Sequence, residues 1–211
     1  MRKFLLAALL VFAGALTSQA QSPETKNEIA GTIGRTFISD QTPPNTNFFD
    51  NTVHFGKGLS LEADYARRLR SYRWADLSVE VPVILNFDED LNYGTSQIPE
   101  GYRSYFITPA ARVNLLPEMV LSPWVSFGAG IGHFSASHNL LFSGTNTGNR
   151  GKTTGVLEAG IGFDVHVPKL RSTTFRFEAR DDWSGVPPLN IDVGKTRQHN
   201  YYVGGGLVFH F

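Results

Sequence analysis

The last eleven residues of the chain, 201–211, read YYVGGGLVFHF. One face of this stretch is largely apolar and carries Tyr201, Val203, Gly205, Leu207, Phe209 and Phe211. The opposite face is smaller or more polar and carries Tyr202, Gly204, Gly206, Val208 and His210. Successive side chains of a strand point to opposite sides. The period of two therefore predicts a β-strand with one apolar face.

The same alternation recurs upstream. It predicts seven further strands, at about 27–37, 58–68, 74–87, 103–115, 123–134, 154–166 and 174–183. Each is close to the roughly 9–11 residues that a tilted strand uses to cross a bilayer. The sequence therefore suits strands that span a membrane.

The lengths of the connections alternate between long and short. Short turns are expected near 70–71, 116–118 and 168–171, and long polar loops at 38–56, 88–102, 135–153 and 184–198. Transmembrane barrels combine long outer loops, short periplasmic turns and an even number of strands. A soluble β-sandwich, the alternative, has no reason to keep this order. The prediction is an all-β fold: an eight-stranded antiparallel up-and-down transmembrane β-barrel.

The N-terminus is typical of an exported protein. A basic start, Arg2 and Lys3, precedes an apolar run and small residues ending at Ala20, which predicts a signal peptide over 1–20 and one barrel domain over 21–211. Removing two of 19 basic residues leaves 17 against 19 acidic ones, a net charge of −2. This balance argues against a nucleic-acid partner. With no cysteine, neither a disulfide framework nor a lipidated cysteine is expected.

Charged residues at mid-strand fall on the face opposite the apolar one. They are Glu62, Glu80, Arg112, Glu158, Arg176, Glu178 and Arg180. Buried charges are tolerated when they pair, and an eight-stranded barrel is just wide enough for side chains to fill it. We therefore expect a polar, salt-bridged and filled lumen, with a proton or ion path as the alternative. Inward glycines such as Gly128, Gly160 and Gly162 would make room for the long side chains.

Outward charges are expected only near strand ends, at Arg35, Asp181 and Arg67. A set of aromatic residues also lies near predicted strand ends, where amphipathic rings favour the membrane–water boundary. The set is Trp74, Tyr105, Trp124, Trp183, Tyr201 and Phe211.

The region from residue 27 to 211 resembles the small bacterial outer-membrane β-barrels, such as the membrane domain of outer membrane protein A and its porin-like relatives. The resemblance rests on the barrel pattern, on Glu178, Ala179, Arg180 and Asp181 in the seventh strand, and on the terminal Phe211. It implies insertion into the cell outer membrane by the barrel-assembly machinery, contact with outer-membrane lipid and lipopolysaccharide, and loops open to a surface ligand. It also implies an assembly signal in the last strand, at Tyr201, Val203, Leu207, Phe209 and Phe211. No peptidoglycan-binding domain is expected after residue 211.

One pair of residues could carry chemistry. His133 and Ser135 are similar to the His-x-Ser of lipid A deacylases, barrels in which a histidine oriented by a carboxylate activates a serine. That family's glutamate falls where this chain has Thr147, and Glu158 is expected to point inward. We therefore predict a non-enzymatic barrel, with a deacylase-type enzyme or a narrow pore as alternatives.

No metal or cofactor is expected. The six histidines show no ligand spacing, and the glycine run 128–132 lacks the helix and acidic residue of a dinucleotide site.

Overall fold

The computed structural model describes residues 25–44, 52–94, 97–167 and 172–211, which form an all-β fold. The strands are β1 (Asn27–Ile38), β2 (His54–Phe55), β3 (Leu59–Ser71), β4 (Ala75–Asn92), β5 (Gly101–Ile107), β6 (Ala110–Leu115), β7 (Leu121–Ala136), β8 (Gly151–His166), β9 (Thr173–Gly185) and β10 (Arg197–His210). The predicted signal peptide, 1–20, lies outside the described residues. Within the described ranges, no helix is long and apolar enough to span a membrane.

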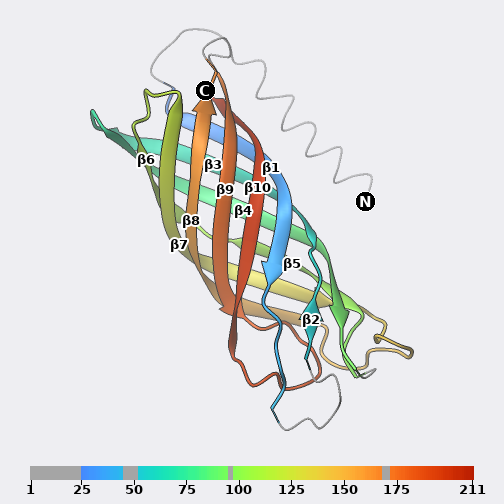
Figure 1. Ribbon diagram of the computed structural model, residues 1–211. Coiled ribbons are helices and arrows are strands. Elements are labelled where there is room, and N and C mark those ends of the chain that lie inside the picture. The colour runs from blue at the N-terminus through green and yellow to red at the C-terminus, as the bar shows by residue number, and fades with distance from the viewer. Residues whose placement is uncertain (1–24, 45–51, 95–96, 168–171) are drawn as a thin grey trace.

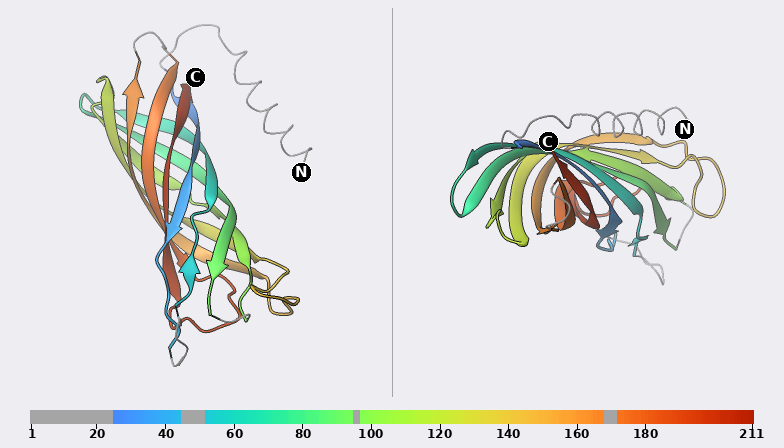
Figure 2. Two further views of the ribbon diagram at one scale, coloured as in Figure 1. Left: turned by 45° about the vertical axis from the view of Figure 1, so that its right-hand side comes forward. Right: turned by 90° about the horizontal axis from the view of Figure 1, so that it is seen from above.

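The sheet closes into a barrel (Figures 1 and 2). β1 pairs antiparallel with β10, from Glu28 opposite His210 to Ile38 opposite Asn200. β5 and β6 lie end to end between β4 and β7, and both pair with these two strands, so together they count as one strand of the barrel wall. The short β2 adds to the end of β4. The wall thus has eight antiparallel positions, which confirms the predicted up-and-down barrel.

The two ends of the barrel differ. β1 begins and β10 ends at one end, which we call the turn end and which lies at the top of Figure 1. The connections there are short, such as 72–74 and 116–120. The opposite end, the loop end, carries the connections 39–58, 93–100, 137–150 and 186–196, with β2 inside the first. The predicted alternation of long and short connections is confirmed.

Several strands reach further than predicted, so three of the loops are shorter than predicted: 93–100, 137–150 and 186–196 in place of 88–102, 135–153 and 184–198. The first connection, 39–58, has about the length of the predicted loop 38–56. β4 continues past Phe87 to Asn92. Its extension is held on one side by Phe55 of β2, opposite Leu91, and on the other by Gly101 and Tyr102 of β5. A register shift between Asn86 and Glu89 lets the ladder resume, as a β-bulge does.

The predicted fourth strand is interrupted at Thr108 and Pro109, between β5 and β6. Proline has no N–H to donate to a ladder, so a break is expected at this position. Two bonds bridge the interruption: Thr108 N donates to Pro82 O at 3.3 Å, and Ala129 N donates to Pro109 O at 3.2 Å. The wall therefore stays closed.

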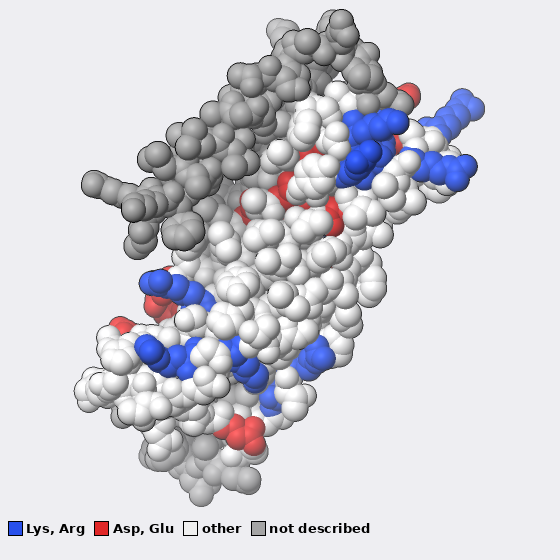
Figure 3. Space-filling view, turned by 180° about the vertical axis from the view of Figure 1, so that it is seen from behind, with Lys and Arg blue, Asp and Glu red and all other residues white. Residues whose placement is uncertain are grey.

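An apolar band covers the outside of the barrel. Its side chains are exposed, with Phe127 at 65%, Ile161 at 62% and Ile33 at 58%. Residues other than Lys, Arg, Asp and Glu cover most of the middle of the face in Figure 3, with some Asp and Glu atoms visible in its upper half and Lys and Arg towards the ends. Exposed apolar surface of this kind is stable against lipid and costly in water.

The interior has two layers. The half towards the turn end is charged and is described below. The half towards the loop end holds an apolar cluster, the apolar layer, that includes Ile84, Phe106 and Phe134, beside buried polar residues such as Asn86 and Glu89. The predicted polar lumen therefore describes the turn-end half, and the apolar cluster of the loop-end half was not predicted. Phe106 and Phe134 alternate with the outward residues of their strands, so the strand period puts both rings inside the barrel.

Glycines make room for bulky side chains in the lumen. A Cβ on Gly162 would lie 2.5 Å from Cζ2 of Trp124, and one on Gly160 would lie 3.2 Å from Cζ3 of the same ring. Gly155, on the same strand, has nothing within 4 Å of the corresponding position. Gly160 and Gly162 of β8 thus leave the space that the indole ring of Trp124 occupies.

Gly162→Ala is expected to lower the free energy of unfolding by about 1–3 kcal/mol, because overpacking a filled core forces side chains to shift. Gly155→Ala, the matched control on β8, is expected to change it by less than about 0.5 kcal/mol. Urea unfolding in lipid vesicles, followed by tryptophan fluorescence, measures both. Equal effects of the two substitutions would contradict the packing described.

Candidate functional site

The seven charged residues predicted for the lumen all lie inside the barrel and are buried: Glu62, Glu80, Arg112, Glu158, Arg176, Glu178 and Arg180. They come from β3, β4, β6, β8 and β9. Strand alternation places them there, because each is out of phase with the apolar outer residues of its strand. The structure brings them together into a single layer, which we call the charged layer together with the further acids named below.

Arg180 has the largest number of acidic neighbours. Its Nε lies 3.1 Å from Glu62, its Nη2 lies 3.3 Å from Glu178, and its Nη1 lies 2.8 Å from Glu80 and 3.0 Å from Glu158. The guanidinium group thus joins carboxylates from β3, β4, β8 and β9. A planar fork of donors is suited to several acceptors at once.

Arg112 and Arg176 hold the part of the layer nearer the turn end. Both contact Glu28, and both contact Asp64, at 3.5 Å from Arg112 and 3.3 Å from Arg176. Arg176 also lies 2.8 Å from Asp164. Arg112 also lies 3.0 Å from Glu80, which links the two parts of the layer.

The predicted network of lumen charges did not include Glu28, Asp64, Asp164 and Asp182, which are also inside the barrel. The alternation does put Asp64, Asp164 and Asp182 on the inward face of their predicted strands. Glu28 is near the start of β1, where the alternation is short. Among the described residues, seven carboxylates contact three arginines, a formal charge of 3 − 7 = −4.

Trp124 lies among the three arginines. Its ring centroid is 5.7 Å from Cζ of Arg112, 5.3 Å from that of Arg176 and 5.1 Å from that of Arg180. The ring is 1% exposed. The prediction that Trp124 lies at the membrane boundary is therefore wrong, because Val125 faces outward and its neighbour must face inward. Cations favour the face of an indole, most strongly when desolvated.

The other predicted boundary aromatics are exposed. Trp74 is 64% exposed, Tyr105 39%, Trp183 38%, Tyr201 42% and Phe211 41%. At the loop end, Trp183, His199 and Tyr201 stack in sequence, with centroids 6.2 Å and 5.6 Å apart. The predicted outward charges Arg35 and Asp181 lie on this rim, and Asp181 pairs with His199 at 2.7 Å.

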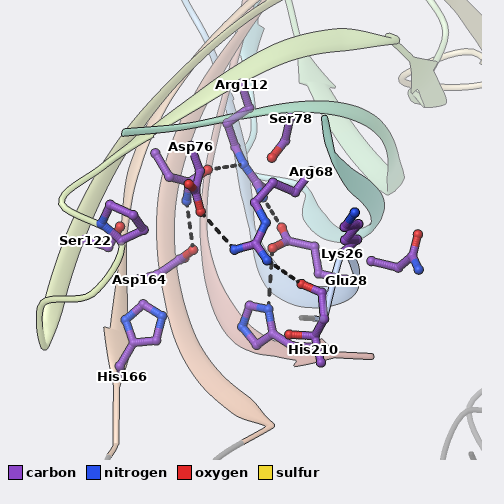
Figure 4. Close-up of a pocket in the computed structure, with 14 residues that line it drawn as sticks. Lys26, Glu28, Arg68, Asp76, Ser78, Arg112, Ser122, Asp164, His166 and His210 are labelled. Atoms are coloured by element: carbon purple, nitrogen blue, oxygen red, sulfur yellow. Dashed lines mark hydrogen bonds and ion pairs between the residues drawn. The ribbon is translucent and has the colours of Figure 1, made fainter. Parts of the chain in front are cut away.

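A polar cavity of about 220 Å³ opens at the turn end (Figure 4). Arg112 and Asp164 line its inner part, and Arg68, His166 and His210 line it nearer the mouth. Arg68 is held by Asp76 at 3.1 Å, and the rings of His166 and His210 stack at 6.3 Å. The cavity has room for several water molecules. Charges of both signs line it, so its electrostatics favour no ligand class.

The apolar layer closes the lumen on the loop-end side of the charged layer. Phe134 packs edge-on against Phe106 at 5.8 Å and against Tyr102 at 5.7 Å. Buried residues from the loop end, Val53, Ile98, Leu189 and Val193, cover these rings. Asn190 Nδ2 donates to Asn146 Oδ1 at 2.9 Å and joins two of the loops. The interior is therefore filled by side chains in both layers.

The His133 and Ser135 pair lies on the outer face of β7 near the loop end. Nδ1 of His133 is joined by a hydrogen bond of 2.8 Å to Oγ1 of Thr153. A hydroxyl thus stands where a deacylase would need the carboxylate that orients its histidine. Thr147 lies in the loop, and Glu158 is inside the barrel on Arg180, as the sequence predicted.

Solved structures with a similar fold are outer-membrane proteins. Neisserial surface protein A is 11% identical over 88% of this chain and 97% of its own, with a TM-score of 0.55. The outer membrane protein OprG from Pseudomonas aeruginosa is 10% identical over 89% and 96%, with a TM-score of 0.51. This chain has the fold of the small bacterial outer-membrane β-barrels. No protein-family model and no curated protein matches the sequence.

The outer membrane enzyme PagL also matches, at 10% identity over 85% of this chain and 97% of its own. Its TM-score of 0.40 is too low to bear on chemistry. Likeness at these identities concerns the barrel fold alone, so the function of this barrel has to be argued from its own residues.

Arg180→Met is expected to lower the free energy of unfolding by about 3–5 kcal/mol, because it leaves buried carboxylates without their cation. Glu178→Leu is expected to cost less, since Arg180 keeps three other carboxylates. Arg35→Gln on the exposed rim should change stability by less than about 0.5 kcal/mol. Urea unfolding in vesicles measures all three, and an Arg180→Met barrel as stable as the Arg35→Gln barrel would contradict the structure.

Proposed function

We propose that the chain is an exported protein of the bacterial cell outer membrane, with its turn end in the periplasm. The apolar band supports contact with outer-membrane lipid. Exposed aromatics lie towards both ends of the band, with Trp74 at the turn end and Trp183 and Tyr201 at the loop end. Long outer loops and short periplasmic turns are the arrangement of this class of barrel. Lipopolysaccharide would then surround the loop end.

We further propose a non-enzymatic structural or surface-interaction role. The observation that carries this proposal is the filling of the lumen in both layers. Trp124, Tyr202, Phe106 and Phe134 are each at most 1% exposed, and loop residues cover the apolar layer. Such an interior favours a closed barrel over a narrow pore, since ions need a continuous polar path.

The four loop-end connections would present the surface that a ligand meets. Their described residues pack on one another and on the barrel: Gln41 Nε2 donates to Gln198 Oε1 of β10 at 2.9 Å, and Asn190 bonds to Asn146. A ligand of the predicted loops 38–56, 88–102, 135–153 and 184–198 would therefore contact a surface whose described residues are packed. Preordered loops bind with a smaller entropic cost than mobile ones.

We propose that the last strand also acts as the assembly signal. Tyr201, Val203, Leu207 and Phe209 are on the outer face of β10, which pairs with β1 to close the ring. Phe211 follows the strand and exchanges two backbone hydrogen bonds with Asn27, at 2.9 and 3.1 Å. An apolar face on the strand that closes the barrel is a feature that assembly machinery could recognise.

Purified, folded protein in planar lipid bilayers is expected to give no steady single-channel conductance, because the two layers block the lumen. Arg180→Ala with Trp124→Ala, which empties part of the charged layer but leaves the apolar layer, should also stay closed. Steady conductance from the unaltered protein would contradict the proposed closed barrel and favour the pore.

The same preparation tests the enzyme alternative. Incubation with lipid A should release no ester-linked acyl chain, since the position beside His133 holds Thr153 and no carboxylate. Release that disappears in Ser135→Ala would overturn the non-enzymatic role.

A further inference from the structure

A carboxylate outside the charged layer is buried towards the loop end. Phe87 and Asp88 are exposed in succession at the bulge of β4, so Glu89 returns to the inside and is 0% exposed. Among the described residues, its hydrogen-bond donors are Gly58 N and Asn86 Nδ2, both at 3.1 Å. A buried negative charge is costly unless a positive charge meets it.

Basic side chains around this segment are directed elsewhere. Lys57 Nζ lies 5.9 Å from the centroid of the Phe37 ring, and Arg35 Nη1 donates to Lys57 O at 3.3 Å. Arg103 is exposed on the outer face of β5. Within the described ranges, no Lys, Arg or His forms an ion pair with Glu89. The negative charge of this carboxylate is therefore not balanced by a described side chain.

Two buried oxygens of this segment have no hydrogen-bond donor. Both hydrogen bonds to Glu89 go to Oε2, and Oε1 has no partner among the described residues. Oδ1 of Asn86, a residue that is 2% exposed, also has none. Buried acceptors are nearly always satisfied in folded proteins. Two acceptors left over beside an unbalanced carboxylate indicate that a positive charge belongs there.

Oxygens of three kinds lie around one point beside Gly58, the residue before β3. A Cβ on Gly58 would lie against Asn86 Oδ1, 2.5 Å from Asp88 O and 2.7 Å from Glu89 Oε2. An amide oxygen, a backbone carbonyl oxygen and a carboxylate oxygen are thus close together. They can approach this closely because residue 58 has no side chain.

We propose that Glu89, Asn86 and the carbonyl group of Asp88 bind a hard metal cation of the Ca²⁺ class. Ca²⁺ takes carboxylate, amide and backbone carbonyl oxygens, and water completes a shell of about 6–8 ligands. The cation would balance the charge of Glu89 and meet the two oxygens that lack donors.

The donor set sets the class of metal and its affinity. No group of three His, Cys, Asp or Glu side chains that could hold a metal ion occurs in the part of the chain that the structure describes. Oxygen ligands without imidazole or thiolate suit Ca²⁺ rather than a transition metal. A single carboxylate corresponds to weak binding, with an expected Kd of about 10⁻⁴–10⁻³ M, as in extracellular calcium modules.

A cation at this position would fasten three strands at the loop end. Gly58 O accepts from Thr36 N of β1 at 3.1 Å, and residue 58 leads directly into β3. Glu89 belongs to β4 and pairs with Tyr102 of β5. The inference does not depend on the proposed function or on the orientation in the membrane.

The direct test uses Tb³⁺ alone, which takes the same oxygen ligands as Ca²⁺ and emits when an excited aromatic ring nearby transfers energy to it. Tyr102, opposite Glu89 and 3% exposed, is such a ring. Folded full-length protein in a zwitterionic detergent is expected to give this emission, and millimolar Ca²⁺ should remove it. Glu89→Gln should weaken Tb³⁺ binding at least about tenfold, since even changes outside the ligand shell typically cost that much.

The matched control is Asp88→Asn with Asp90→Asn, which removes two exposed charges of the same segment and keeps the buried carboxylate. It should weaken binding less than Glu89→Gln does, because exposed charges are screened by salt. An equal loss in the control would assign the ion to the surface acids and overturn the proposal. So would emission that Ca²⁺ does not remove, or Glu89→Gln binding as the unaltered protein does.

Urea unfolding in vesicles separates a cation ligand from a residue that only fills space. In a chelator, the Glu89→Gln barrel is expected to be at least as stable as the unaltered one, because an unbalanced buried charge is gone. In millimolar Ca²⁺ the unaltered barrel should become the more stable of the two, since a ligand that binds only the folded state raises its stability. The same order with and without Ca²⁺ would contradict the site.

Gly58→Ala tests the arrangement of the oxygens. The added methyl group should abolish Ca²⁺-sensitive Tb³⁺ emission, whereas Gly155→Ala, which has nothing within 4 Å of its Cβ, should leave it unchanged. Gel mobility without boiling first shows that each variant is folded, and Glu89→Gln decides if Gly58→Ala does not fold. A folded Gly58→Ala barrel with full emission would overturn the site beside Gly58.

Discussion

Three buried arginines must each be satisfied by carboxylates inside a barrel whose outside is apolar. The charged layer achieves this by drawing one or more acids from β1, β3, β4, β8 and β9 to Arg112, Arg176 and Arg180. An isolated charge in such a place would cost several kcal/mol. The pairing therefore holds most of the wall in one register, since a slip of one residue would move every acid to the lipid face.

Trp124 and the apolar layer complete the interior. The indole fills the space between the guanidinium groups, and the glycines of β8 admit it. On the loop-end side of Trp124, the inward residues include Phe106, Phe134 and Tyr102, and residues of the loop-end connections cover them. Because the charged layer and the covered apolar layer fill the lumen, other molecules can contact the barrel at its outer surface, its rims and its loops.

The alternation of apolar and polar residues was sufficient to predict the strands of the barrel and the inward position of the seven lumen charges, because a strand in lipid permits few exceptions to its pattern. The order of long and short connections followed from where those strands begin and end. Trp124 was misplaced because aromatic residues near strand ends were assigned to the boundary without regard to their parity. Phe106 and Phe134 were on the inward parity, but their packing depends on residues far away, such as Ile98 and Leu189. The partners of each arginine likewise depend on how strands meet across the lumen, which no local pattern contains.

The most direct test is the gel mobility of membrane-extracted protein with and without boiling, for the full chain and for a chain lacking 201–211. A closed barrel that depends on β10 pairing with β1 predicts a shift on boiling that vanishes in the shortened chain. No shift for the full chain, with the protein in the soluble periplasmic fraction, would contradict the barrel and with it the division of residues between lumen and lipid.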